Sequence, residues 1–113
     1  MDANAYKESQ RRVAIDTATA VINGRVGIVE GSRILSRLSY DLVVDPRADK
    51  DFLVFLGVDS ETDVLPIGDV RKHWNVLALE REDAKIADAD EFFRERVVEA
   101  CHHLLDRLRD VQL

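Results

Sequence analysis

The stretch LEREDAKIADADEFFRERVVEACHHLLDRLRDV, from Leu79 to Val111, decides the predicted fold. Apolar side chains recur in it at steps of seven, seven, four, four, three, four and three residues, which places them on one side of a helix. This stripe consists of Leu79, Ile86, Phe93, Val97, Cys101, Leu104, Leu108 and Val111. The pattern predicts a long C-terminal helix whose apolar side packs against the rest of the chain.

The C-terminal helix is predicted to begin at Val76. Asn75 is typical of an N-cap residue, and Trp74 and Leu79 occupy the positions of a hydrophobic staple. A helix from there to the last residues extends about 50 Å at about 1.5 Å per residue. Because that length exceeds the expected width of a domain of this size, we expect either a kink near residues 87–90 or an end that projects into a partner.

Two further helices are predicted in the first 42 residues. The first carries a stripe made of Tyr6, Val13, Thr17, Ala20 and Val21. The second carries a stripe made of Ile28, Gly31, Leu35, Leu38 and Leu42. The Asn23-Gly24 stop between the two predicts an antiparallel hairpin. Gly27 and Gly31 lie one turn apart, so we expect a neighbouring helix to come close there.

The segment FLVFLGV, residues 52–58, is ambiguous because its residues favour strands. No second strand is evident to pair with it, and a lone strand leaves its backbone groups without hydrogen bonds. We therefore predict a helix that starts near Lys50, after a turn that begins at Pro46. The resulting fold class is all-α: a small bundle of about four helices with an N-terminal antiparallel hairpin and a long C-terminal helix. Residues 1–113 are expected to form a single helical domain.

The composition narrows the classes of function. The net charge of −6 argues against nonspecific nucleic-acid binding, which needs clustered Lys and Arg. The single cysteine, Cys101, excludes an internal disulfide and lies on the apolar stripe, as expected for an inert core thiol. No apolar run approaches the roughly 20 residues of a membrane span, and the N-terminus lacks the apolar core of a signal peptide. We expect a cytoplasmic protein that binds neither membranes nor nucleic acid.

The stretch GVDSETDVLPIGDVRKHW, residues 57–74, contains the candidate functional residues. Asp59, Glu61 and Asp63 alternate as in a calcium loop, but the sixth and twelfth positions are valines rather than the required Gly and Glu. One interpretation is electrostatic: these acids pair with Arg33, Arg71 or Lys72 and fix the loop after Pro66. A second interpretation is a partner-binding surface made of Asp59, Glu61, Asp63, Arg71 and Trp74. Both stay open at this point.

A metal site is the third interpretation. Asp59 and Asp63 lie one helical turn apart, and with Glu30 from the second helix they form a hypothetical Mg²⁺ ligand set. We expect no cofactor, because one carboxylate pair rarely holds this ion without substrate phosphates or further acids. No nucleophile elbow and no phosphate-binding Gly-rich loop occur in the sequence.

Residues 20–105 resemble a group of small uncharacterised bacterial proteins. The resemblance is carried by IVEGSRILSRL from Ile28, then by DFLVFLGVDSETDVLPIGDVRKHW from Asp51, then by the long charged helix. It implies that the block GxDSETDxLPxGxVRxxW is a signature region, and it transfers no activity. Proteins of this size and type are often immunity proteins that neutralise toxins delivered between bacteria, which is an association of class rather than of motif.

These observations lead to one functional hypothesis and two alternatives. The hypothesis is a non-catalytic protein-binding module, in its most concrete form an immunity-like inhibitor of a basic toxin. The first alternative is a Mg-dependent enzyme acting on a phosphorylated small molecule, with Glu30, Asp59 and Asp63 as ligands. The second is a structural protein that forms a homodimer through its long C-terminal helix.

Overall fold

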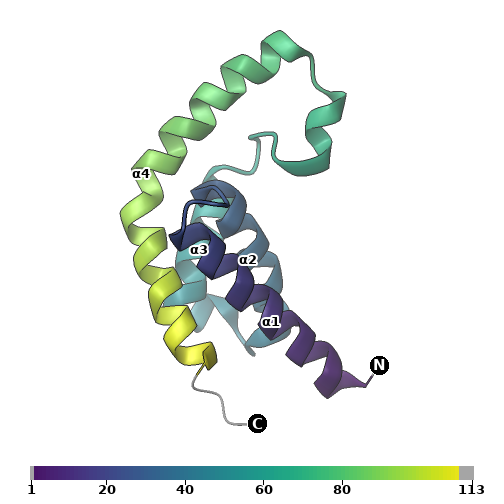
Figure 1. The fold of residues 1–113 in the computed structure, drawn as a ribbon, viewed down its shortest axis with the longest axis vertical. Helices are drawn as coiled ribbons and strands as arrows, with labels where there is room; N and C mark the ends of the chain where they lie inside the picture. Colours follow the sequence, from purple (N-terminus) through teal and green to yellow (C-terminus); the bar gives the residue numbers. More distant parts are fainter. Residues whose placement is uncertain (1, 110–113) are drawn as a thin grey trace.

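The computed structural model describes residues 2–109, and Figure 1 shows their arrangement. The described chain contains no strand. Its elements are α1 (Ala3–Ile22), α2 (Ile28–Leu42), the 3-10 turn η1 (Pro46–Ala48), α3 (Lys50–Glu61), the 3-10 turn η2 (Gly68–His73) and α4 (Val76–Arg109). The all-α prediction is confirmed, including the start of the third helix at Lys50 and the turn at Pro46.

Helices α1 and α2 form the predicted antiparallel hairpin. Near the open end, the Asp41 carboxylate of α2 accepts hydrogen bonds from Tyr6 Oη at 3.1 Å and Gln10 Nε2 at 3.0 Å, both from the start of α1. The stripe predicted for α1 is correct only in its second half, because Tyr6 and Val13 are exposed. The first turns of α1, which include Tyr6, extend beyond the neighbouring helices (Figure 1). Val13 lies further along, next to the fully buried Ala14, so its side chain lies on the uncovered side of the helix.

Close packing at Gly31 joins α1 to α2. A Cβ atom built on Gly31 would overlap Cγ2 of Val21, a buried residue near the end of α1. The prediction of close approach is therefore confirmed at this glycine, where the missing side chain lets the two helices touch. At Gly27 the near neighbour is a carboxylate: a Cβ atom there would lie 3.2 Å from Oδ2 of Asp90 in α4.

Helix α3 forms because its N-terminus is capped and its apolar face finds a core. The Asp49 carboxylate accepts hydrogen bonds from the backbone N–H groups of Asp51 and Phe52, both at 3.1 Å. Phe52 and Phe55 are fully buried and meet edge to face with ring centroids 6.1 Å apart. The strand-forming composition of residues 52–58 is thus explained by burial of large side chains.

Helix α4 runs for 34 residues without a break, so the expected kink at residues 87–90 is wrong. Figure 1 shows a smoothly curved helix whose second half lies against the other helices and whose first half projects beyond them. Val97, Cys101 and Leu104 are fully buried in the core, whereas Leu79 and Ile86 are only half-buried. Val111, the last member of the predicted stripe, lies outside the described residues. Burial raises the pKa of the Cys101 thiol to about 12, as expected for an inert core cysteine.

A charged cluster fixes the second half of α4 to the start of α3. Arg107 donates to Asp49 at 2.9 and 2.6 Å and to the buried Asp51 carboxylate at 2.8 Å. His103 Nδ1 lies 3.3 Å from the other oxygen of Asp51. Asp51 is almost fully buried, so a carboxylate there needs these partners, and the cluster sets the register between the two helices.

Replacement of Gly31 by Ala tests the contact between α1 and α2. We expect the added methyl group to displace the stiff Val21 side chain and to lower the free energy of unfolding by about 1–3 kcal/mol. Urea unfolding followed by circular dichroism measures this change. Gly57→Ala is the matched control, because a Cβ atom at Gly57 meets nothing within 4 Å. Equal or higher stability of Gly31→Ala would contradict the close packing.

Replacement of Arg107 by Gln tests the charged cluster. The hydrogen bond from Arg107 holds the pKa of Asp49 below its ordinary value, so the stabilisation is present above about pH 4 and is lost as the pH falls through the folded-state pKa. We expect the variant to lose about 1–2 kcal/mol at neutral pH, at the low end for a charged hydrogen bond because Arg107 is 41% exposed. Its stability should also fall less steeply in acid. Urea unfolding between neutral and acidic pH, with Arg109→Gln as control, measures both effects.

Candidate functional site: an acidic arch on the helical core

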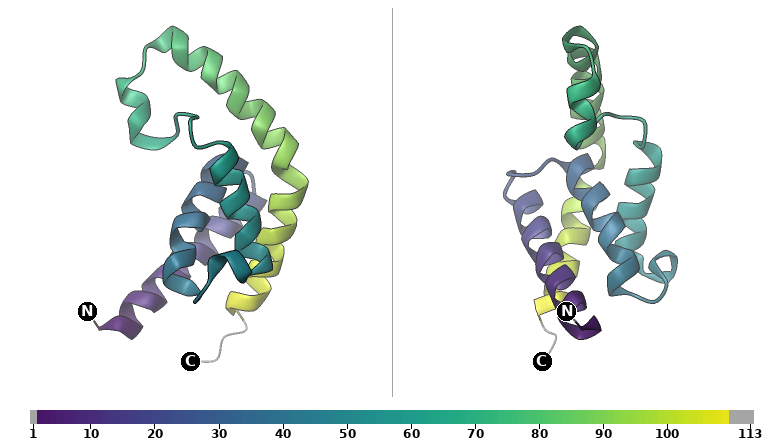
Figure 2. Two further views of the ribbon diagram at one scale, coloured as in Figure 1. Left: turned by 180° about the vertical axis from the view of Figure 1, so that it is seen from behind. Right: turned by 90° about the vertical axis from the view of Figure 1, so that its right-hand side faces the viewer.

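Residues 65–91 form an arch that stands beyond the helical core. One limb is the segment that contains η2, and the other is the first half of α4. Figure 1 shows the two limbs joined at their far end, and Figure 2 shows that the arch is narrow when seen edge-on. The arch lies at one end of the longest molecular axis, which measures 49 Å.

Arg33 of α2 fastens the first limb of the arch to the core. Its guanidinium donates to the Asp59 carboxylate at 3.1 Å, to the Leu65 carbonyl at 3.1 Å and to the Thr62 carbonyl at 2.6 Å. The Arg33 side chain is largely buried, so these contacts form away from bulk water. The electrostatic interpretation of the acids is therefore confirmed for Asp59, which pairs with Arg33.

The second limb is fastened through Asp90. One oxygen of its carboxylate accepts a hydrogen bond from the backbone N–H of Val29 at 2.8 Å. Gly27 precedes α2 and has no side chain to cap the helix, so Asp90 of α4 supplies the missing acceptor. A carboxylate at this position also interacts favourably with the positive end of the helix dipole.

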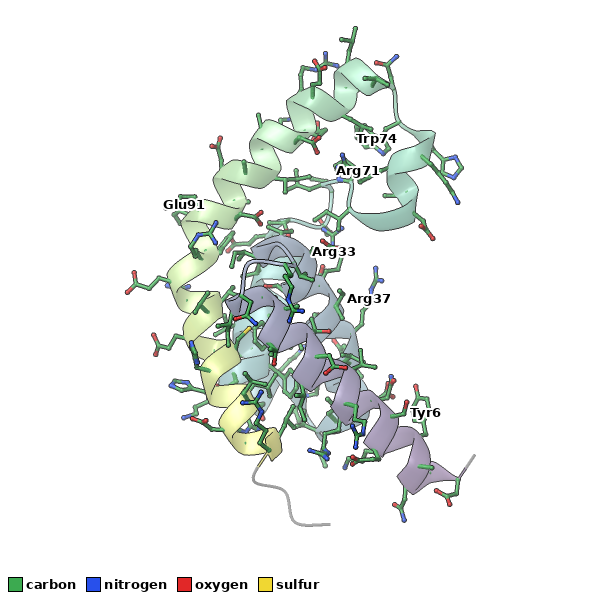
Figure 3. All side chains as sticks on the ribbon, viewed as in Figure 1. Tyr6, Arg33, Arg37, Arg71, Trp74 and Glu91 are labelled. Carbon is green, nitrogen blue, oxygen red and sulfur yellow. The ribbon has the colours of Figure 1, made fainter. Side chains whose placement is uncertain are left out.

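Arg71 connects the two limbs. It forms a two-pronged ion pair with Asp83 at 2.7 and 3.1 Å and donates to the Pro66 carbonyl at 3.1 Å. The hydrogen bond from Arg71 lowers the pKa of Asp83. Figure 3 shows Arg71 and Trp74 side by side between the limbs. Trp74 is 36% exposed, so most of its surface is covered by the arch.

The predicted N-cap of α4 is confirmed at the far end of the arch. Asn75 Oδ1 accepts hydrogen bonds from the backbone N–H groups of Leu77 at 2.8 Å and Ala78 at 3.3 Å. The arch therefore turns where a capping residue starts the long helix.

The structure separates the five residues predicted to bind a partner. Glu61 and Asp63 are exposed at the end of α3 and form no ion pair within the described part of the chain. Asp59 is committed to Arg33, and Arg71 is committed to Asp83. The free carboxylates thus lie beside the base of the arch, while the aromatic and cationic residues lie inside it.

The hypothetical magnesium ligands do not share a cavity. Glu30 lines a cavity of about 410 Å³ under the arch, together with Arg71, Asp83 and Asp90. Asp59 and Asp63 line a different one, an open groove of about 710 Å³ between α2 and α3. Among residues 2–109, no group of three or more His, Cys, Asp or Glu side chains is arranged to hold a metal ion.

The whole net charge of the chain is located in and beside the arch. Residues 59–91 contain ten acidic and four basic residues, a formal charge of −6, which equals that of the entire chain. The other residues contain twelve of each sign and are balanced. The tip of the arch also exposes apolar side chains: Val76 is 71% exposed and Leu77 is 64% exposed. The arch itself, residues 65–91, contains seven acidic and four basic residues and carries −3 of this charge, and Asp59, Glu61 and Asp63 beside its base carry the other −3. The arch therefore combines part of the acidic charge with exposed apolar surface at its tip.

No protein-family model, curated protein or solved structure matches this chain, so the resemblance seen in its sequence stays a prediction. None of the helices that the structure describes combines the length and the apolarity needed to cross a membrane.

Sequence reasoning missed Asp83 and Asp90 as determinants of the site. Asp83 lies 12 residues after its partner Arg71, and Asp90 lies 61 residues after the amide that it caps. Neither separation follows a helical period. The concentration of negative charge in residues 59–91, in contrast, can be found by counting the acidic and basic residues along the sequence.

Replacement of Arg71 by Gln tests how the arch is held. Both partners of the ion pair are partly exposed, so we expect the free energy of global unfolding to change little. The limbs should separate locally, and Trp74, the sole tryptophan, should become more accessible to acrylamide. Fluorescence quenching measures this effect, with the neighbouring variant Lys72→Gln as control. Unchanged quenching in Arg71→Gln would show that the ion pair does not close the arch.

Proposed function

We propose that this protein is a non-catalytic binding module that holds a basic protein partner through the acidic surface of residues 59–91. The observation that carries the proposal is the location of the entire net charge on the arch and on the end of α3 beside its base, together with exposed apolar side chains at the tip of the arch. A partner approaching the arch meets both features before it meets the core.

The two features have different physical roles. The negative field steers a basic partner towards the arch and raises the association rate. The exposed apolar side chains of Val76 and Leu77 supply contacts that lose water on binding and slow dissociation. Their position next to the turn at Asn75 supports this role, because the narrow tip can enter a concave surface.

The free carboxylates of Glu61 and Asp63 extend the acidic surface from the base of the arch. Arg71 and Trp74 act indirectly by keeping the limbs in place. The most specific form of the proposal is an immunity-like inhibitor that occupies the basic active site of a toxin, such as a nuclease, in the cytoplasm. The size of the chain and the sign of its charge support that form.

Charge reversal on the acidic surface tests the proposal. A variant with Glu61→Lys, Asp63→Lys and Asp69→Lys should lose capture of a basic protein from a lysate of the source cells by about tenfold or more, because each exposed carboxylate contributes to steering. The captured partner is identified by mass spectrometry, and its binding is then measured with purified proteins at low and high salt.

The matched control carries Asp16→Lys, Glu95→Lys and Asp106→Lys. These three acids are also exposed but lie outside residues 59–91. The control receives the same change in net charge and should retain binding. Equal loss in both variants would mean that only the total charge matters, and equal retention would remove the acidic surface from the proposal. Circular dichroism confirms that both variants keep the helical fold.

A further inference from the structure

Residues 67–74, which we call the strap, form a segment of the arch with little packing of its own. The strap contains η2, and among the helices and turns of residues 2–109, η2 alone contains no buried residue. It is also the only one of these elements whose backbone does not pack closely against another. Segments with few buried contacts open locally at a lower free-energy cost than core helices do. We therefore expect the strap to open more easily than the helices that it connects.

Both ends of the strap are fixed. Pro66, just before it, is fully buried, and Arg33 donates to the carbonyl of Leu65 at 3.1 Å. Asn75, just after it, caps α4. Gly68 lies near the first end with a φ of 81°, a conformation that glycine adopts without strain. The strap thus has a fixed point at each end and a permissive backbone position next to the first.

One ion pair holds the middle of the strap on α4. Among residues 2–109, the only hydrogen bonds between the strap and α4 are those that Arg71 donates to Asp83, at 2.7 and 3.1 Å. Figure 3 shows Arg71 between the two limbs. Beneath the strap lies the cavity of about 410 Å³, where Ile67 and Ile86 line the opposite walls. Side chains that face a cavity lack the dispersion contacts of a packed interface, and a partly exposed ion pair is a weak closure.

We propose that the strap opens as a unit while the core and α4 stay folded, and that opening releases Asp83 as a free carboxylate. Helix α4 stays in place because it is continuous with the core and because Asp90 binds the Val29 amide. In the closed form Arg71 neutralises Asp83 and the strap covers the apolar side of α4. In the open form both become accessible, and a basic partner that prefers this form shifts the equilibrium towards it. Only this last step rests on the proposed function.

Hydrogen exchange followed by nuclear magnetic resonance tests the opening. The Trp74 amide donates to the Arg71 carbonyl within the strap at 3.0 Å, whereas the Ile86 amide lies in the unbroken helix α4. After correction for intrinsic rates, the Trp74 amide should exchange about tenfold or more faster than the Ile86 amide in the wild type. Equal rates at the two amides would overturn the proposal, because the two limbs would then open together.

Exchanging the charges of the ion pair tests the closure. Arg71→Glu and Asp83→Arg should each raise the exchange rate of the Trp74 amide by about threefold or more, because each places like charges opposite one another. The double variant should return towards the wild-type rate, although the hydrogen bond from Arg71 to the Pro66 carbonyl is not restored. Unchanged rates in the single variants, or no recovery in the double variant, would exclude the ion pair as the closure. Circular dichroism should show the same helical content in all three.

Polyarginine, a soluble probe of basic chemistry, tests the release of Asp83. Arg71→Gln removes the partner of Asp83, whereas Lys72→Gln removes the same charge from a neighbour that forms no ion pair within residues 2–109. At matched low salt, calorimetric titration should show about threefold tighter binding of polyarginine to Arg71→Gln than to Lys72→Gln. Equal affinities would mean that Asp83 is not released. Neither measurement uses a partner captured from cells, so the strap and the proposed function fail or stand separately.

Discussion

The guanidinium of Arg33 determines where the core ends and the arch begins. Asp59 lies in the last turn of α3, where the helix dipole disfavours a carboxylate, and Arg33 supplies the compensating positive charge. The same guanidinium donates hydrogen bonds to the carbonyl oxygens of Thr62 and Leu65, which follow the end of the helix. One largely buried cation therefore ends α3, orients the departing chain and fixes the first limb of the arch.

Much of the core could be predicted because its elements follow local rules. The stripe on α2 and the Asn75 cap have periodic or local signals, and residues 52–58 could be assigned to a helix because no partner strand exists. The arch could not be predicted in this way. Its two fastenings, Arg71 with Asp83 and Asp90 with the Val29 amide, join residues whose separation carries no periodic signal. Exposure of Tyr6 has a similar origin, because periodicity does not reveal where a neighbouring helix ends. Val13 was assigned to the wrong side of α1, since the neighbouring Ala14 is the buried residue.

The stripe on α4 illustrates the same limit more sharply. Its apolar period continues from Leu79 to Leu108, yet only the second half closes the core. A helical period tells which side of a helix is apolar, and it does not tell what covers that side. In the first half, Ile86 lines the arch cavity instead of the core, and Leu79 and Ile86 both remain half-buried. Because α4 is unbroken, its packing in the core also sets the direction in which the second limb of the arch extends.

Gly31 and Gly57 both lie inside helices, but only one of them is required by packing within the chain. At Gly31 the Val21 side chain occupies the space that a Cβ atom would take, so the fold itself explains this glycine. Gly57 also lowers the stability of its helix, but a Cβ atom there would meet nothing within 4 Å, so no contact within the described chain explains it. The acids of residues 59–91 divide in the same way: Asp59, Asp83 and Asp90 hold the arch in place, whereas the exposed Glu61 and Asp63 form no ion pair within residues 2–109. Gly57 and the two unpaired carboxylates are exposed, and the contacts within the described chain do not require them.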